Sequence, residues 1–210
     1  LWAVEAAGDL GVYDRKRSLH ASQTLQVHKA LPPAGTIRMS GRVANVYDKG
    51  KATLVKIEVE SEYFTAGYSI FLPGVGGWGG DRGPSSEKGE APELVYEADF
   101  TTDRNLAARY RLTGDLHPIH IDPEVARANG FDRPILHGLC TLGIAARMLA
   151  GQVGAHPADL MSLSARLSAP VFPGETVLVR SGGTAEAARF EAQSNGVVVL
   201  GSGEASFRSS

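Results

Sequence analysis

The sequence predicts an α+β fold in which an antiparallel sheet packs against one long helix. Strand-like segments outnumber helical ones and follow one another without helices between most of them. Residues 134–150 carry the longest run of apolar and small residues at helical spacing. Asn195-Gly196, the strongest short hairpin signal, joins the last two strand candidates. This order does not fit a doubly wound parallel sheet.

The first half of the chain is predicted to be mostly strands, because its segments are rich in β-branched residues or alternate in polarity. The turn residues 48–51 separate two of these segments and predict a hairpin. Residues 1–13 are expected to be the tail of a helix whose start is missing. The four strand candidates are residues 24–29, 36–47, 52–60 and 63–72.

A glycine-rich stretch at residues 74–86 separates the halves and cannot hold a regular element. Two interpretations remain open: a flexible linker, or a backbone that approaches a ligand or packs flat on a sheet. No Gly-Lys-Ser/Thr closes the stretch, so it is not a phosphate loop. We therefore divide the chain into an N-terminal unit, 1–90, that includes this linker, and a C-terminal unit, 91–210.

The second half predicts a strand, a loop flanked by two short helices, the long helix and four more strands. In the long helix, Asp132 can cap the N-terminus, Pro134 suits the first turn and Gly151 ends it. The short helices are expected at 106–112 and 124–129, and the strands at 94–101, 160–169, 176–181, 187–194 and 197–207.

Composition excludes several classes of protein. The 210 residues are 43% hydrophobic and 21% charged, which is ordinary for a globular chain and excludes a disordered one. A net charge of −2 argues against a nucleic-acid partner, and no apolar run approaches the roughly 20 residues of a membrane span. The single cysteine, Cys140, excludes an internal disulfide and favours a reducing compartment, with cytoplasm as the expected location.

The loop at residues 113–123 holds the residues best suited to chemistry. Its two prolines forbid a continuous helix, so its turns project Asp115, His117, His120 and Asp122 individually. A carboxylate and an imidazole can hold one water and move its protons, so we favour Asp115 and His120 as a general acid/base dyad. A metal site made of His117, His120 and a carboxylate remains an alternative, and Asp122 is expected to be a helix cap.

The segment 133–140 is predicted to form the first turn of the long helix. Its unpaired N–H groups and positive dipole end suit an oxygen that gains negative charge, and Gly138 lets a ligand approach its N–H. His137 and Cys140 lie three residues apart, which raises the possibility of a thiol nucleophile. A packed, unreactive cysteine is the favoured interpretation.

Two motifs make the chain resemble a known family. Residues 110–123, with Gly-Asp-Leu-His-Pro-Ile-His-Ile-Asp-Pro at 114–123, and residues 130–143, with His-Gly-Leu-Cys-Thr-Leu-Gly at 137–143, resemble the MaoC-like R-specific (type 2) enoyl-CoA hydratases. The resemblance extends over nearly the whole chain. It implies a double hot-dog fold, with two antiparallel sheets that each pack around a central helix. Residues 1–90 would then be a degenerate, truncated unit and residues 91–210 the catalytic one.

The resemblance also implies roles for individual residues. Asp115 and His120 would be the catalytic pair, and the N–H of Gly138 would bind the thioester carbonyl oxygen. Two departures from the family pattern stand out: His117 replaces the usual Asn, and Ala21-Ser22 replaces the usual Gly-Glu. The residues expected to contact substrate are His20, Ala21, Lys49, Leu116, His117, Pro118, Ile119 and Leu167.

The implied reaction is reversible hydration of trans-2-enoyl-CoA to (3R)-3-hydroxyacyl-CoA by a homodimer, without metal or cofactor, since the CoA thioester is the substrate. A thioesterase would need a carboxylate on the long helix, and residues 134–150 contain none. A non-catalytic acyl-CoA-binding partner subunit also remains open, as do an acyl-carrier-protein dehydratase and a hydratase for steroid side chains. Candidates for the CoA phosphates are Lys49, Lys51, Arg133 and Arg166.

Overall fold

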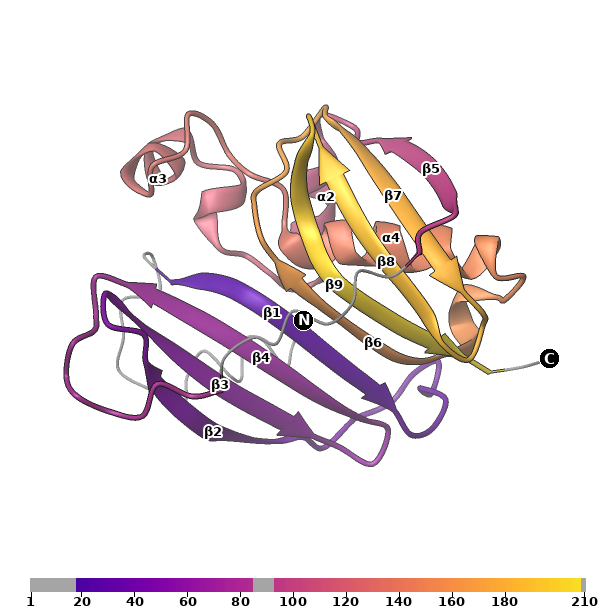
Figure 1. Cartoon of the computed structure of the whole chain (residues 1–210), viewed down its shortest axis with the longest axis horizontal. Helices are drawn as coiled ribbons and strands as arrows, with labels where there is room; N and C mark the ends of the chain where they lie inside the picture. The colour runs from indigo at the N-terminus through magenta and orange to yellow at the C-terminus, as the bar shows by residue number, and fades with distance from the viewer. Residues whose placement is uncertain (1–17, 85–92, 209–210) are drawn as a thin grey trace.

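A computed structural model describes residues 18–84 and 93–208 of the chain. It confirms the antiparallel sheet with one long helix (Figure 1). The strands are β1 (Leu19–Val27), β2 (Ser40–Asp48), β3 (Ala52–Glu60), β4 (Phe64–Pro73), β5 (Tyr96–Thr101), β6 (Leu160–Leu167), β7 (Thr176–Gly183), β8 (Ala188–Ser194) and β9 (Val197–Phe207). The helices are α2 (Leu106–Tyr110), α3 (Pro123–Ala128) and α4 (Gly138–Gln152), with 3₁₀ turns η2 (Arg111–Thr113), η3 (Pro118–His120) and η4 (Pro157–Asp159).

The predicted hairpins are confirmed. β2 and β3 pair across the turn at 48–51, and β8 pairs with β9 across Asn195-Gly196. Asn195 and Gly196 have φ values of 50° and 76°, the left-handed geometry that a two-residue hairpin turn requires. The helix expected at residues 1–13 lies outside the described residues.

The strands of the described residues form one sheet, in the order β2-β3-β4-β1-β6-β9-β8-β7-β5. The expected arrangement of two sheets that each pack around their own helix is not confirmed, because the described strands form a single sheet. β1 pairs antiparallel with β6, with Leu25 opposite Leu163, and so fuses the two halves. The fusion removes two sheet edges whose backbone groups would otherwise lack partners.

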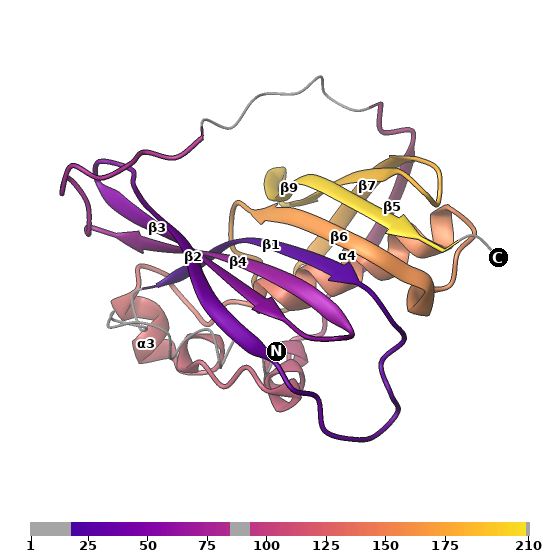
Figure 2. The same cartoon turned by 90° about the horizontal axis from the view of Figure 1, so that it is seen from below.

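The hydrophobic core consists of a larger cluster in the C-terminal half and a smaller one in the N-terminal half. α4 packs against β5 to β9, and its buried Ala145, Leu149 and Ala150 belong to one apolar cluster with the inward residues of those strands (Figure 2). A smaller cluster around Val59 and Tyr68 lies on β3 and β4. None of the helices in residues 18–84 and 93–208 has the length and apolar character of a membrane span.

The long helix begins later than predicted. Gly138, rather than Pro134, is its first residue, Asp132 is not its cap, and the helix continues past Gly151 to Gln152. The reason lies in the preceding segment, where the N–H of Leu136 donates to the carbonyl of Val171 at 2.7 Å. This bond ties the segment to the loop after β6, and His137, with ψ 130°, is not in a helical conformation, so the helix starts at Gly138.

The glycine-rich stretch, described as far as residue 84, folds against the turn between β2 and β3. The buried carboxylate of Asp48 accepts the N–H groups of Gly77 and Gly79 at 2.9 and 2.8 Å. A Cβ atom on Gly76 would lie 2.5 Å from the backbone nitrogen of Ala52. The flat-packing interpretation therefore holds for 74–84, and residues 85–86 lie outside the described ranges.

Candidate active site

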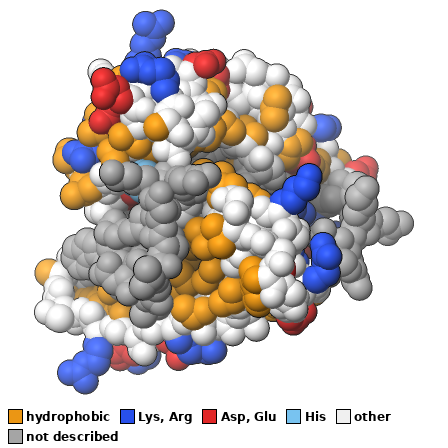
Figure 3. Space-filling model, turned by 90° about the vertical axis from the view of Figure 1, so that its left-hand side faces the viewer, with side chains coloured by type: hydrophobic (Ala, Val, Ile, Leu, Met, Phe, Trp, Pro, Cys, Tyr) orange, Lys and Arg blue, Asp and Glu red, His pale blue; other side chains and the backbone are white. Residues whose placement is uncertain are grey.

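A cavity of about 600 Å³ lies between the two halves of the chain, lined by β3 and β4 on one side and by the 115–120 loop and the start of α4 on the other. The wall from the N-terminal half consists of Ser18, Leu19, His20, Ile57, Tyr68 and Ile70. On the face of the molecule in Figure 3, hydrophobic side chains gather near the middle and most charged ones lie toward the edge. Most of the residues that line the cavity are apolar, and its polar groups include His20 on β1 as well as Asp115 and His120 on the facing loop.

The loop that lines the cavity with residues 115–120 is held by a series of tight turns. Gly114, at φ 125°, ends η2 in a conformation that favours glycine and places Asp115 at the wall. Nδ1 of His117 accepts the N–H of Ile119 at 3.2 Å and caps η3, which ends at His120. The expected cap of the next helix is confirmed, since Asp122 accepts N–H groups at the start of α3.

His120 has a defined proton arrangement. Its Nδ1 lies 2.9 Å from the carbonyl oxygen of Ile135, which can only accept, so Nδ1 carries the hydrogen. In the neutral ring, Nε2 is then left with a lone pair. Burial, followed by the repulsion that a protonated His137 would exert, lowers the pKa of His120 to about 4. The ring is therefore neutral around pH 7, with its free lone pair on Nε2.

Asp115, His120 and His137 form a tight cluster. A carboxylate oxygen of Asp115 and one ring nitrogen from each histidine lie within 4.8 Å of one another. Two hydrogen bonds of ordinary length to one water span about 4.6 Å, so a single water can bridge the carboxylate and an imidazole. The sequence identified Asp115 and His120 as a pair, and the fold brings them together.

His137 is the member of this cluster whose role the sequence analysis missed. It is 1% exposed, and its ring stacks on that of His120 with centroids 3.6 Å apart and planes at 21°. Stacked rings direct their in-plane lone pairs along nearly parallel planes, so they are poorly placed to share one metal ion. His117, which we had considered as a metal ligand with His120, is not in the cluster.

The thiol alternative loses support. Cys140 is buried, and burial raises the pKa of its thiol to about 11. A thiol that stays protonated near neutral pH is a poor nucleophile. The packed-cysteine interpretation therefore holds.

The N-terminus of α4 opens onto the same cavity. Gly138 lines it, and no side chain of the described residues caps the helix. The first helical bond at this end runs from the N–H of Cys140 to the carbonyl of His137. A Cβ on Gly138 would lie 1.9 Å from Cδ2 of Leu167, so Leu167 closes over this glycine. The arrangement presents backbone N–H donors to a ligand atom beside Leu167.

The remaining predicted contacts divide into two groups. His20, Leu116, His117, Pro118, Ile119 and Leu167 line the cavity. Ala21 and Lys49 are not among its lining residues, and Lys49 instead donates to the carbonyl of Arg82 and lies 5.3 Å over the ring of Tyr47. Contact of these two residues with substrate stays a prediction. The apolar wall of Ile57, Tyr68 and Ile70 carried no recognisable sequence signal, because it depends on the pairing of β1 with β6.

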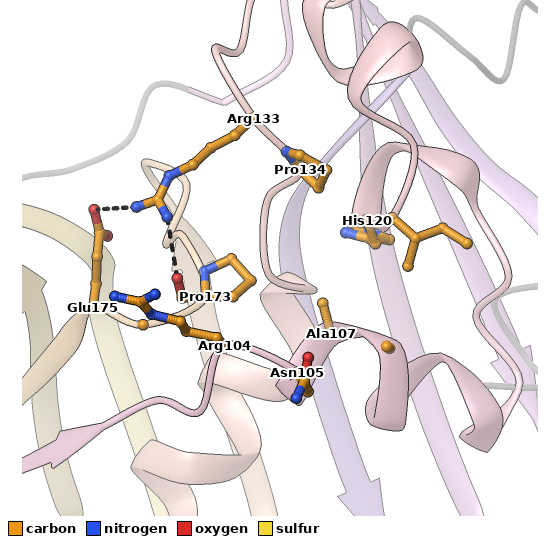
Figure 4. Close-up of a pocket in the computed structure, with 11 residues that line it drawn as sticks. Arg104, Asn105, Ala107, His120, Arg133, Pro134, Pro173 and Glu175 are labelled. Carbon is orange, nitrogen blue, oxygen red and sulfur yellow. Dashed lines mark hydrogen bonds and ion pairs between the residues drawn. The ribbon is translucent and has the colours of Figure 1, made fainter.

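A second cavity of about 650 Å³ reaches His120 from another direction (Figure 4). Arg104, Arg133 and Glu175 lie on its wall. Arg133 pairs with Glu175 at 3.6 Å and donates to the carbonyl of Pro173 at 3.2 Å. His120 thus borders a mainly apolar chamber and a charged groove.

Comparison with known proteins gives two family matches. Residues 86–202, more than half of the chain, match the model described as a MaoC like domain. Residues 6–73 match the model described as an MFE-2 hydratase 2 N-terminal domain.

Individual relatives agree with these matches. The chain is 37% identical over 179 residues to a probable enoyl-CoA hydratase 2 of Dictyostelium discoideum, covering 79% of this chain and 60% of that protein. It is 39% identical over 188 residues to 3-hydroxyacyl-thioester dehydratase Y of Mycobacterium tuberculosis, covering 83% of this chain and 65% of that protein. Full-length peroxisomal multifunctional enzyme type 2 of Drosophila melanogaster superposes with a TM-score of 0.79 at 32% identity, over 90% of this chain and 37% of that one. The chain thus spans less than two thirds of each relative.

Proposed function

Because this chain belongs to the MaoC-like domain family, we propose that it catalyses the reversible addition of water to trans-2-enoyl-CoA, giving (3R)-3-hydroxyacyl-CoA. One observation carries the proposal. The Asp115 carboxylate and the His120 imidazole lie within reach of one water, in a cavity that also receives the N-terminus of α4. The names of the two hydratase and dehydratase relatives support the same reaction class.

The helix end would stabilise the charge that develops during the reaction. With the thioester carbonyl oxygen at the N–H of Gly138, addition at C3 moves an electron pair through C2 to that oxygen as an enolate. Backbone donors and the positive end of the helix dipole stabilise this charge, and loss of one such donor typically costs about 2.7–4 kcal/mol.

The dyad would activate the water. His120, neutral with a lone pair on Nε2, accepts one proton as the water oxygen bonds to C3. Asp115 orients the water through its carboxylate. Nε2 then returns the proton to C2 of the enolate, so the product gains one H and one OH and the dyad returns to its initial state. The reaction needs no metal or cofactor, and the CoA moiety is part of the substrate.

We further propose that the chain is a double hot-dog protein whose two half-sheets join through β1 and β6. Its N-terminal unit would be residues 1–90 and its catalytic unit residues 91–210. The two family matches, at 6–73 and 86–202, support this division. A homodimer and a cytoplasmic location remain predictions, and the Drosophila neighbour carries the word peroxisomal in its name.

The test follows the loss of enoyl-thioester absorbance with short, medium and bulky trans-2-enoyl-CoA substrates and with an acyl-carrier-protein thioester. Wild type is compared with Asp115→Asn, and the product is analysed for chirality. We expect formation of the 3R product, reduced at least 10²-fold in the variant. Full turnover by Asp115→Asn would exclude the dyad.

Other outcomes would favour the alternatives. Binding of acyl-CoA without turnover by the folded wild type would point to a binding subunit. Release of free CoA would indicate a thioesterase.

A further inference from the structure

We propose that His137, which directly precedes α4, is a positioning residue. It holds the Asp115 carboxylate and the His120 ring in fixed positions relative to each other. This inference rests on the proposed hydratase function and adds a third residue to its machinery. His137 immediately precedes the helix and contacts both members of the dyad.

The contact with Asp115 is a backbone hydrogen bond. Nε2 of His137 lies 3.2 Å from the carbonyl oxygen of Asp115. A carbonyl only accepts, so Nε2 carries the hydrogen and donates it. Asp115 follows Gly114, a residue whose backbone can adopt many conformations. The bond from His137 therefore fixes the backbone of the loop at Asp115, the residue that carries the carboxylate.

The contact with His120 is a ring stack. The His137 ring lies 3.6 Å from that of His120, and Tyr110 packs at a tilt of 54° with its centroid 4.9 Å away. His120 is held at Nδ1 by the carbonyl of Ile135, so the stack adds a constraint on the plane of the ring. Together the two contacts fix the orientation of the His120 ring beside Asp115.

A buried polar atom supports a role beyond packing. Nδ1 of His137 is buried and has no hydrogen-bond partner among residues 18–84 and 93–208. An apolar side chain would fill this site without that desolvation cost. The unpaired Nδ1 of His137 therefore has a desolvation cost, and this cost falls on the residue whose Nε2 donates to Asp115.

Other groups around His137 are charged or titratable. Burial lowers its pKa, with the Asp115 carboxylate opposing and the charges of Arg111 and His117 adding to the decrease. The neighbouring Tyr110 and Cys140 have raised pKa values, mainly from burial, and therefore stay neutral. His137 is thus neutral around pH 7 and able to donate only through Nε2.

Two variants separate the two contacts. His137→Phe keeps an aromatic face for His120 and loses the donor to Asp115. His137→Gln keeps an amide donor near the position of Nε2 and loses the stack. We expect each to lower kcat about 10²-fold with a much smaller change in KM, because a small displacement of reacting groups has that effect on rate. The matched control is His28→Gln. His28 is an exposed histidine just after β1, and its ring forms a hydrogen bond with Thr65 on β4.

The same proteins distinguish failure of this inference from failure of the proposed function. If wild type does not hydrate any enoyl thioester, the proposed function fails. If wild type is active and both variants keep wild-type kcat and pH profile, the positioning role is wrong. A loss confined to KM would also overturn it, since that pattern marks a substrate contact.

A measurement on wild type keeps the inference testable if both variants unfold. Nitrogen NMR of the histidine side chains at pH 7 is expected to show His137 protonated at Nε2 and bare at Nδ1. A ring protonated at Nδ1 would contradict the proposal, because Nε2 could not then donate to Asp115.

Discussion

The side chain of Leu167 closes over Gly138, and a Cβ atom added to this glycine would lie 1.9 Å from Cδ2 of Leu167. Gly138→Ala is therefore expected to push Leu167 into the space beside the helix N-terminus. We expect kcat for hydration to fall about 10²–10³-fold, because the carbonyl oxygen loses its approach to the backbone donor. Steady-state kinetics on a trans-2-enoyl-CoA measure the effect.

The same helix offers a matched control. A Cβ on Gly143 would meet no atom of the described part of the chain within 4 Å, so Gly143→Ala is expected to keep activity and to raise stability slightly. In Gly138→Ala with Leu167→Ala the obstruction is removed, and part of the lost rate should return. Equal activity of Gly138→Ala and wild type would contradict the placement of the oxyanion at this N–H.

The pH profile should report the neutral state of His120. Burial lowers its pKa to about 4, so the ring loses its basic lone pair only near that pH. We expect the acid limb of kcat/KM to fall with an apparent pKa near 4, well below the ordinary histidine value of 6.5. An acid limb centred near 6.5 would mean that His120 is not the buried base of the free protein.

The pH dependence of stability is expected to reflect the buried histidines His20 and His120. The pKa values of His20 and His120 are lowered to about 4, chiefly by burial, from 6.5. Between pH 4 and 6.5 the unfolded chain binds more protons at these sites than the folded one, so the free energy of unfolding rises with pH. Thermal unfolding should give a Tm that falls from pH 7 to pH 4, less steeply in His120→Asn. An unchanged slope in that variant would contradict the shift.

Asp48 is expected to hold the glycine-rich segment on the sheet. Its carboxylate accepts backbone N–H groups of Gly77, Gly50 and Gly79, which hold its pKa below the ordinary value. Asp48→Asn should lower Tm at pH 7 and increase proteolysis at residues 74–84. A lowered carboxyl pKa contributes stability that is lost as pH falls, so the Tm difference should narrow in acid.

Asp81→Asn is the control for that experiment. The Asp81 side chain accepts only the N–H of Gly83, two residues away, among the bonds found in the described residues. We expect it to leave proteolysis at 74–84 close to wild type. If Asp48→Asn behaves the same way, the carboxylate does not hold the segment.

The N-terminal wall of the cavity should set the preference for acyl chains. Ile70 lines the cavity from β4, so Ile70→Ala enlarges the chamber beside the substrate. We expect kcat/KM for bulky enoyl-CoA to rise relative to short ones by about 10-fold or more, the scale of one or two methylene groups in an apolar pocket. Competition between chain lengths, monitored by product analysis, measures the ratio.

Val55→Ala tests whether this effect is local. Val55 packs against the same small core as Ile70 but does not line the cavity. It should lower stability without changing the ratio between chain lengths. A similar shift in both variants would assign the change to loosening of β3 and β4.

Local sequence patterns predicted much of the secondary structure. Strands β3 and β9 match their predicted ranges, because alternation and turn residues such as Asn195-Gly196 act over a few neighbours. The order of Asp115 and His120 on a loop with two prolines also pointed to their pairing. In contrast, the start of α4 was misplaced, because the bond from Leu136 to Val171 joins residues far apart in sequence.

The sequence by itself determined the antiparallel α+β class, the element order and the identity of the polar pair at the site. Only the tertiary structure decided that β1 pairs with β6, which makes one sheet of two halves and supplies the wall at Ile70. Only it placed the ring of His137 against His120. Hydrogen-bond register and ring stacking depend on contacts between distant segments, and a local pattern of residue types contains no record of those contacts.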